Sequence, residues 1–555
     1  MARTITAKEV YDEYQKGLGF KNQINLFETV KTNEDFFVGK QWEGVVSNGL
    51  PTPVFNFLQR TVMFALSNIV SDNLKLHASA FSATADRETT ERMAEIVSAE
   101  FDRIAEQVKL GTLLREMGRN AAVDGDGCIY AYWDDKVETG QRVRGAIACE
   151  VIENTRVFFG NPNDRKVQNQ PYIIIAKRRL VDDAREKAKK YGARDWEKIG
   201  PDTDDSDHNN ENLTDDKVTV LLRLWRDKKT ETIWAVETTR DVVIREPWDT
   251  KLKLYPLVWM NWHYVQNNYH GRSMISGLIP NQVFVNKLFA MSMLSLMTTA
   301  YPKVVYDRTR IAKWDNSVGA AIPVNGGDVN NVAKILDPAP ISPQIAQFIQ
   351  MTVEMTQSNL GATPVALGEG KAYNTSAIIA LQKAAATPSE LTRQNLYQCV
   401  EDLGRIFIEF MRVYYGKRKV YASMPKDPQI QMAAQFAGVP VNMEAPQEFD
   451  FSQLENAHFT MKLDVGASSY WSEIAAIQTL DNLLQTGALP LTLYLRHMPR
   501  GYIPGQDDMI RELEGVPQIA PSSSNVPNDI VEIPGETPGT LTEAYRQLRE
   551  AVMQP

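Results

Sequence analysis

Apolar residues recur every three to four positions through most of the first 120 residues, which is the spacing of amphipathic helices. The pattern predicts helices from Leu26 to a stop at Gly39, over 51–76 and over 86–110. Short β-like runs then predict strands at 128–133, 145–152, 172–176, 218–225, 232–237 and 242–246. A basic helix over 180–191 interrupts these strands and ends at Gly192. Residues 1 to about 265 are therefore expected to form an α+β body in which helices come first and an antiparallel meander follows.

The rest of the chain has longer apolar stretches, and the expected fold class of the whole is α+β and mainly helical. An apolar helix at 273–299 is expected first, followed by strands at 303–306 and 320–324 and a second helix at 342–360. A glycine-punctuated loop at 361–374 then leads into a long helix at 376–415 that is kinked at Pro388. After Gly416 the pattern predicts small helices with one strand at 458–465, a proline-rich linker at 516–540 and a terminal helix at 541–553.

The expected helix at 342–360 has an unusual polar face. Gln344, Gln347, Gln350, Glu354 and Gln357 recur every three to four residues and share one side. Apolar residues lie mostly on the other side, namely Ile345, Phe348, Ile349, Val353 and Met355. A neutral amide surface suits a wall along which a polyanion moves without sticking, because fixed positive charge would bind phosphates. Glutamines that only form hydrogen bonds between helices explain the same pattern, and composition does not separate the two interpretations.

Composition and charge narrow the class of protein. The chain has 555 residues, 43% of them hydrophobic, and a formal net charge of −9, so it is not a basic nucleic-acid coat along its whole length. Cys128, Cys149 and Cys399 lie far apart, which favours a reducing compartment. The N-terminus lacks the apolar region of a secretory signal. The cleanest apolar part of 275–300 covers 13 residues, so a buried or subunit-packed helix is expected there and not a membrane span.

Several motifs resemble catalytic or metal sites but lack a required residue. Gly368-Glu-Gly370-Lys371 lacks the first glycine and the final Ser or Thr of a phosphate-binding loop. The acidic segment 200–216 has carboxylates but almost no apolar residues to hold them in place, so a solvated loop is expected. Asp124-Gly-Asp-Gly-Cys128 has a cysteine where a calcium loop needs oxygen, and it fits a turn into a strand. The six histidines have no paired metal-ligand spacing, and a structural role is expected for His263 and His270. No enzymatic activity and no cofactor is predicted.

Other segments resemble the portal proteins of tailed bacteriophages. The similar motifs are Asn33-Glu-Asp-Phe-Phe-Val-Gly-Lys-Gln-Trp42, Asp124-Gly-Asp-Gly-Cys-Ile-Tyr130, Val157-Phe-Phe-Gly-Asn-Pro162, Tyr269-His-Gly-Arg-Ser-Met-Ile275, Pro280-Asn-Gln-Val-Phe-Val-Asn286 and Met461-Lys-Leu-Asp-Val-Gly-Ala467. They occur in order from about residue 22 to residue 514, whereas the tail after Gly515 is not covered. The resemblance implies a ring of twelve subunits at one capsid vertex. The ring would carry double-stranded DNA during packaging and ejection.

The resemblance also implies a division into regions. These are a wing (1–271), a first stem helix (272–300), a clip (301–341), a second stem helix (342–360), a tunnel loop (361–375), a kinked wing helix (376–416), a helical wing and crown region (417–515) and a tail (516–555). The apolar helix would then pack against identical neighbours, as ring contacts require.

Candidate functional residues follow from this division. The DNA-facing candidates are Glu369, Lys371 and Asn374 in the tunnel loop, with Lys287, Gln347, Gln350 and Gln357 in the stem. The candidates for motor or adaptor contact in the clip are Arg308, Arg310 and Lys313. The implied partners are further copies of the chain, DNA, the terminase large subunit, a head–tail adaptor, and the major capsid and scaffolding proteins, with no membrane. The implied location is the virion, after assembly in the host cytoplasm. Two alternatives remain: a phage-encoded metal-dependent nuclease or ATPase, and a capsid or scaffold protein.

Overall fold

The structure is a computed structural model, and the residues that it describes are 5–47, 49, 51–70, 74–80, 87–203, 216–300, 303–315, 317, 320–336, 344–359, 389–422, 445–456, 459–464, 477, 480–487, 489–498 and 509–510. The chain divides into two compact units, Met1–Ser472 and Glu473–Pro555. In the second unit, the helix α13 (Leu491–His497) is held to the preceding helical segment, residues 480–485, by a hydrogen bond of 2.6 Å from the Tyr494 hydroxyl to Asp481. All other elements below belong to the first unit.

Helices dominate the first 125 residues, as the apolar periodicity predicts. They are α1 (Ala7–Gln23), α2 (Leu26–Val38), α3 (Phe57–Ile69), α4 (Arg87–Gln107) and α5 (Leu110–Asp124). Gly39, with φ +94°, ends α2 at the predicted stop. The helix expected at 51–76 is wrong at its C-terminal end, because residues 75–80 form the strand β1 (Lys75–Ala80).

The predicted meander is present as two antiparallel sheets. The strands are β2 (Asp126–Asp134), β3 (Ala146–Ile152), β4 (Val157–Phe159), β5 (Tyr172–Leu180), β6 (Lys217–Arg226), β7 (Ile233–Thr238), β8 (Val243–Asp249) and β9 (Leu257–Asn261). The first sheet has the order β3-β2-β9 and the second β4-β5-β6-β7-β8. The basic helix α6 (Val181–Lys190) connects β5 and β6, and Gly192 follows it at φ +76°, as expected.

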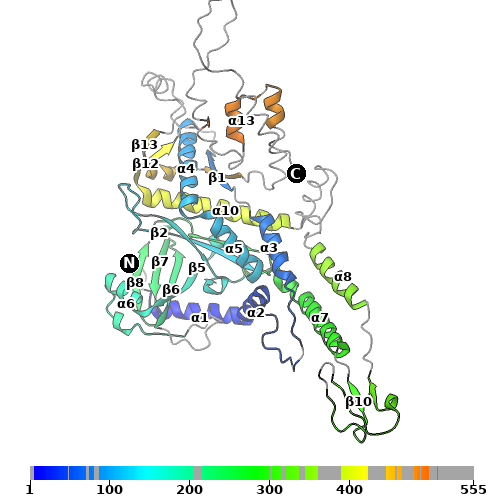
Figure 1. The fold of residues 1–555 in the computed structure, drawn as a ribbon. Coiled ribbons are helices and arrows are strands. Elements are labelled where there is room, and N and C mark those ends of the chain that lie inside the picture. The colour runs from blue at the N-terminus through cyan, green and yellow to red at the C-terminus, as the bar shows by residue number, and fades with distance from the viewer. Residues whose placement is uncertain are drawn as a thin grey trace, which may run out of the picture. The chain divides into compact units, whose positions relative to one another are not determined.

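The main core lies where α5 and α10 (Glu390–Phe410) pack on the first sheet, and α4 packs against β1, α5 and α10 (Figure 1). α10 buries the apolar stripe that its sequence predicts, with Leu396, Val400, Leu403 and Phe407 all at most 1% exposed. It is the described part of the long helix expected at 376–415, and its last turn, Met411–Tyr415, is π-helical. The expected kink at Pro388 lies outside the described residues.

The chain beyond Gly416 differs from the expectation of small helices with one strand. Three strands are present: β12 (Lys417–Ala422), β13 (Ala445–Asp450) and β14 (Phe459–Asp464). β12 pairs with β13, and β14 pairs with β1, which lies almost 400 residues earlier. Only the strand at 458–465 was expected. The pairing of β14 with β1 depends on the tertiary fold, because local sequence does not specify such a distant partner.

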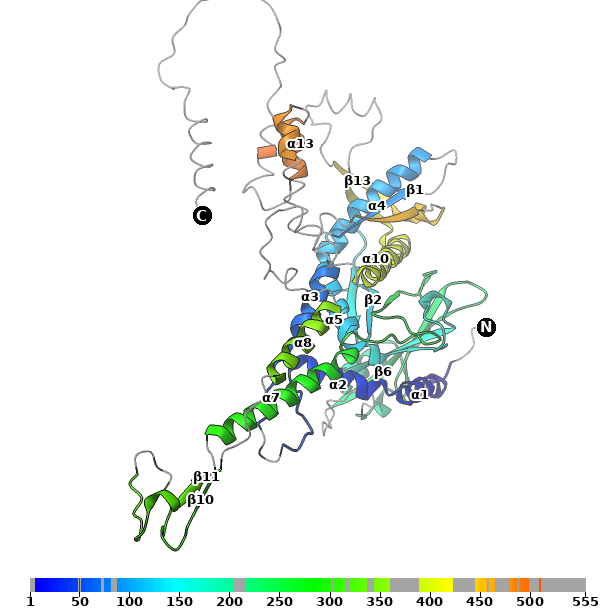
Figure 2. The same cartoon turned by 90° about the vertical axis from the view of Figure 1, so that its right-hand side faces the viewer.

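Residues 279–359 form a separate feature, here called the projection. It consists of α7 (Ile279–Ala300), a knob of residues 303–336, and α8 (Gln344–Asn359). α7 and α8 run side by side, and the knob follows at the far end of α7 (Figures 1 and 2). The knob contains the antiparallel strands β10 (Val304–Tyr306) and β11 (Ala333–Ile335).

Two boundaries predicted in the projection are wrong. The first helix begins at Ile279 and not at residue 273, because Ile275–Gly277 form a 3₁₀ turn before it. The strand expected at 320–324 is irregular, and β10 pairs with β11 instead. Pro323 lacks the N–H that a strand ladder needs, and Gly326 and Gly327 have positive φ, which ends the extended segment.

Candidate channel wall, docking knob and their attachment to the body

Buried polar side chains attach the start of the projection to the body. Asp126, at the start of β2, is 0% exposed and its carboxylate accepts hydrogen bonds from Asn261 Nδ2 (2.7 Å) and from the backbone N–H of Gly271 (2.6 Å). Its second oxygen lies 2.6 Å from His270 Nδ1 and accepts from Asn154 Nδ2 at 3.2 Å. These four contacts, here called the Asp126 hub, fix the backbone just before the projection.

Burial shifts the pKa values of titratable side chains in this attachment. Burial lowers the pKa of His270, so that the neutral imidazole is favoured. Burial also raises the pKa of Asp124, at the C-terminal end of α5, to about 8.

The structural role expected for His270 is confirmed. The turn predicted for the Asp124–Cys128 motif is confirmed as well, because Gly125, with φ +102°, follows α5 directly and β2 begins at Asp126.

A second polar cluster holds the N-terminal part of α7. Gln282 Nε2 donates to the Phe55 carbonyl at 2.8 Å and to Asn286 Oδ1 at 2.9 Å. Asn286 Nδ2 in turn donates to Gln41 Oε1 at 2.6 Å. Asn281 Nδ2 donates to Thr356 Oγ1 of α8 at 3.0 Å. These neutral groups fix the register of α7 against the loop before α3 and against α8.

Most of α7 is exposed in the single subunit. Its side chains beyond Asn286 are half-buried or exposed, and its large exposed apolar residues are Phe284, Met291, Met293, Leu294, Leu296 and Met297. The expected burial is therefore not provided by the chain itself. The length argument against a membrane span is also wrong, because the helix has 22 residues and is long and apolar enough to cross a membrane. A single helix of this kind is weak evidence for a membrane.

α8 has three distinct stripes and not the two faces that its sequence suggests. Ile345, Ile349 and Thr356 pack inward, since they are half-buried or buried. The amide stripe contains the predicted Gln347 and Gln350, which are exposed, and Gln357, which is half-buried. Gln350 Nε2 donates to Glu354 Oε1 at 2.7 Å. A third stripe is exposed and consists of Phe348 (52%), Met351 (50%) and Met355 (59%), of which the sequence assigned Phe348 and Met355 to the apolar side and Met351 to the polar face.

Fixed charge is almost absent from the two helices. Lys287 in α7 is exposed, and Glu354 is the acidic residue of α8; no other Lys, Arg, Asp or Glu occurs within Ile279–Ala300 or Gln344–Asn359. A helix surface this poor in charge does not hold a polyanion by ion pairs. Its exposed apolar stripes are unfavourable in water and need a partner.

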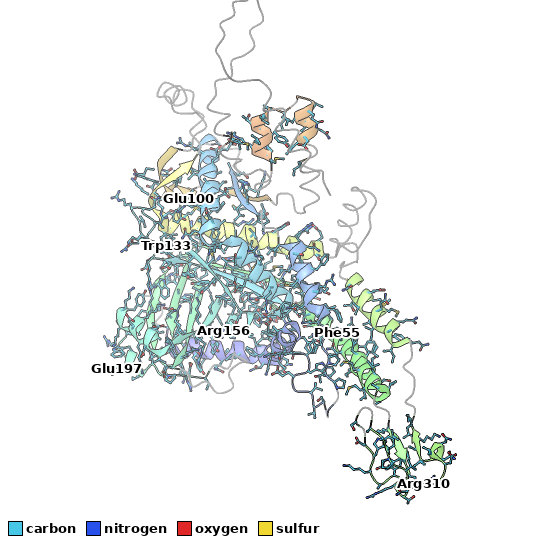
Figure 3. All side chains as sticks on the ribbon, viewed as in Figure 1. Phe55, Glu100, Trp133, Arg156, Glu197 and Arg310 are labelled. Carbon is cyan, nitrogen blue, oxygen red and sulfur yellow. The ribbon has the colours of Figure 1, made fainter. Side chains whose placement is uncertain are left out.

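The knob places the three predicted basic residues differently. Arg308 and Lys313 are exposed. Arg310 is half-buried, and its guanidinium donates to the Gly326 carbonyl from Nη2 (2.5 Å) and Nε (3.2 Å) (Figure 3). A side chain at Gly327, which has φ +81°, would collide with this guanidinium. Arg310 therefore links its own segment of the knob to the turn at Gly326, whereas the charged groups of Arg308 and Lys313 are exposed to solvent.

Other sequence candidates are placed as follows. Glu369, Lys371 and Asn374 lie outside the described residues. Asp202, at the start of the acidic segment, forms an ion pair with Arg178 and accepts from the backbone N–H of Thr219 at 3.0 Å, so it is held by its own sheet and is not simply solvated. Within the described residues, no three His, Cys, Asp or Glu side chains are grouped to hold a metal ion. Cys128, Cys149 and Cys399 are free thiols.

Sequence reasoning missed two features of this region. The first is the Asp126 hub, although the Asp-Gly-Asp-Gly and Tyr-His-Gly-Arg segments that form it had both been singled out as motifs. Their contact is formed between residues 144 positions apart, which no local pattern indicates. The second is the exposed Phe348–Met351–Met355 stripe, whose spacing of three and four residues could have separated it from the packed side.

A family model described as "Phage P22-like portal protein" matches residues 22–493, which is most of the 555-residue chain. No curated protein matches the chain.

Proposed function

The chain belongs to the phage P22-like portal protein family, and from this premise we propose that it forms a twelve-subunit ring through which double-stranded DNA enters and leaves the capsid. The family match over 22–493 is the observation that carries this proposal. At the coarser level, the protein is a phage portal protein, a structural component of an oligomeric ring associated with a vertex of the virion capsid. The terminase large subunit, a head–tail adaptor, and the major capsid and scaffolding proteins are its proposed partners.

The regions of the fold are assigned accordingly. The body up to residue 271 is the wing, α7 and α8 are the stem helices, and the knob is the clip between them. α10 is the described part of the kinked wing helix, and residues from 417 onward contribute wing and crown. What supports this assignment is the order of elements together with the exposed apolar residues of α7 and α8, which a ring of identical neighbours would cover.

The amide stripe of α8 is the proposed channel wall. Gln347, Gln350 and Gln357 offer hydrogen-bonding groups but no fixed positive charge, so they would neither release counterions from DNA nor retain its phosphates. Ring symmetry repeats each lumen residue once per subunit, so one substitution changes the channel charge many times over. The proposed tunnel loop, with Glu369, Lys371 and Asn374, remains a sequence-based assignment.

The exposed charges of the knob are the proposed contacts for the motor or the adaptor. Arg308 and Lys313 are accessible for ion pairs with a partner. Arg310 is a weaker candidate than the sequence suggests, because its guanidinium already binds the Gly326 carbonyl.

Electron microscopy of the purified full-length protein tests the ring. Rings with a central hole are expected, and closed shells or filaments would contradict the proposal.

A packaging assay then tests the channel wall. Adding positive charge with Gln347→Lys and Gln350→Lys should slow DNA passage through rings of normal appearance. Gln15→Lys, at an exposed position of α1 in the body, is the matched control, because it adds the same kind of charge outside the proposed channel wall and outside the knob. An unchanged packaging rate in the Gln347→Lys, Gln350→Lys ring would contradict the wall assignment, and unchanged packaging and ejection after Lys371→Ala would remove the tunnel-loop assignment.

A further inference from the structure

A loop of the body packs along one side of α7. Its described residues, 40–47, 49 and 51–56, are here called the flank loop. The Phe55 ring stacks on the Phe289 ring with 4.1 Å between ring centroids, and Gln282 donates to the Phe55 carbonyl (Figure 3). Gln282 and Phe289 are seven residues apart, so both lie on the same side of the helix. The flank loop therefore covers that side alone.

The flank loop is held in shape but presents apolar side chains to solvent. Trp42 Nε1 donates to the Pro53 carbonyl at 2.9 Å, which ties the two ends of the loop together. Val45 and Val46 are nevertheless 55% and 81% exposed, and Phe55 is 51% exposed. Glu43 is exposed beside the two valines and is the only acidic residue of the flank loop, whereas Lys40, at its start, is exposed as well.

The opposite side of α7 carries a second exposed apolar stripe. Phe284, Met291 and Leu294 are spaced by seven and three residues, which places them on one face. Five residues separate Phe284 from Phe289, which turns the two side chains to about 140° from each other on an α-helix. Lys287 lies on this stripe between Phe284 and Met291 and is exposed, with no ion pair among the described residues. It is the only charged residue of α7.

We propose that the flank loop of one subunit packs against the Phe284–Met291–Leu294 stripe of the next subunit, with Glu43 paired to Lys287. This inference rests on the proposed ring. A closed ring of more than two subunits needs two different contact surfaces on each copy, and these two surfaces lie on opposite sides of one helix. Both surfaces have exposed apolar side chains, and the charges beside them, Glu43 in the flank loop and Lys287 on the stripe, are of opposite sign. The pairing places Lys287 in the subunit contact and removes it from the channel wall.

A charge-swap experiment on the full-length chain tests the pairing. Glu43→Lys and Lys287→Glu should each lower the yield of rings, measured by mass photometry, roughly tenfold, because each places like charges together at an apolar contact. The double variant should recover most of the yield. Glu28→Lys, at an exposed position of α2, is the matched control and should assemble normally. Full ring yield in both single variants, or no recovery in the double variant, would overturn the pairing.

Cross-linking tests the head-to-tail direction independently. Val46→Cys and Met291→Cys are placed in a Cys149→Ser background, since the other two cysteines are buried. With a short bis-maleimide, the chain carrying both cysteines should give a ladder of covalent oligomers. A mixture of the two single variants should stop at dimers, and each single variant alone should stay monomeric.

The outcomes separate this inference from the proposed function. Rings in the microscope without cross-links, or dimers from one single variant alone, would overturn the pairing and leave the portal ring intact. Absence of rings for the unmodified chain would overturn the ring itself. Flotation of the chain with phosphatidylcholine vesicles in place of ring assembly would show that a membrane covers the α7 stripe and would also overturn the pairing.

Discussion

The Asp126 hub includes the residues just before α7, His270 and Gly271, but the hub and the helix differ in how their side chains are satisfied. In the hub a fully buried carboxylate has four hydrogen-bonding partners from three segments of the body. In α7 most side chains beyond Asn286 are uncharged, and many of the large apolar ones are exposed. The hub is complete within one subunit. The surface of α7 is incomplete without a partner, so the two regions should respond in opposite ways to substitution.

The largest change in the free energy of unfolding is expected for a substitution in the Asp126 hub. Asp126→Asn keeps the shape of the side chain but replaces one acceptor oxygen with a donor group among donors. We expect a loss of about 3–5 kcal/mol in the free energy of unfolding, because buried donors lose their charged acceptor. Urea denaturation followed by tryptophan fluorescence measures it. Asp135→Asn, at an exposed position just beyond β2, is the control. Equal stability of the two variants would mean that the hub does not hold the body together.

A pH-dependent effect is expected from Asp124. Its native pKa is raised to about 8 from an ordinary value of 3.8, so between these values the folded state holds a proton that the unfolded state has released. The free energy of unfolding should therefore fall as pH rises through this range, by up to about 1.4 kcal/mol per pH unit. In Asp124→Asn this dependence should disappear. Urea denaturation at pH 5, 6, 7 and 8 tests it, and parallel pH profiles for the variant and the unmodified protein would exclude Asp124 as the cause.

A smaller and local effect is expected in the knob. Arg310→Ala removes the hydrogen bonds to the Gly326 carbonyl and should destabilise the knob by about 1 kcal/mol. Faster amide exchange within 303–336 should report it, with the body unchanged. Arg308→Ala, two residues away and exposed, should leave exchange in the knob as it is. Equal amide-exchange rates within 303–336 in the two variants would show that the Arg310 hydrogen bonds do not stabilise the knob.

The smallest effect on stability, but a large one on assembly, is expected in α8. Met351→Asp places a charge at an exposed position of the subunit and should change the free energy of unfolding by less than about 0.5 kcal/mol. The same charge should block ring formation if a neighbour covers the Phe348–Met351–Met355 stripe. Gln350→Asp, one residue away on the amide stripe, should still form rings. Mass photometry of both variants decides, and normal assembly of Met351→Asp would show that this stripe is not a subunit contact.

Much of the fold could be predicted from local patterns. The apolar period located α2, α4 and the described part of α10, and the β-like runs located the meander. The errors fall where the neighbour is distant. β12 and β13 are strands because each pairs with the other across more than 20 residues, and the expected strand at 320–324 failed because Val304–Tyr306 pairs with Ala333–Ile335.

The candidate site divides in the same way. The amide stripe of α8 and the low charge of α7 and α8 could be inferred from residue type and helical spacing, because each is a property of a single segment. The different roles of Arg308 and Arg310 could not, because they depend on a carbonyl 16 residues further along the chain. For the same reason the sequence predicted a buried or subunit-packed α7 and placed Phe348 on the apolar side of its helix, but it could not show that both are exposed in one subunit.

By itself the sequence determined the order of helices and strands, the near-absence of charge from α7 and α8, and the family motifs spread along the chain. The tertiary structure decided which motifs meet, and it brought Asp126 to His270 across 144 positions. It also decided which apolar residues remain uncovered. Local periodicity indicates which side chains favour burial, but only the tertiary structure shows which of them are covered by other residues.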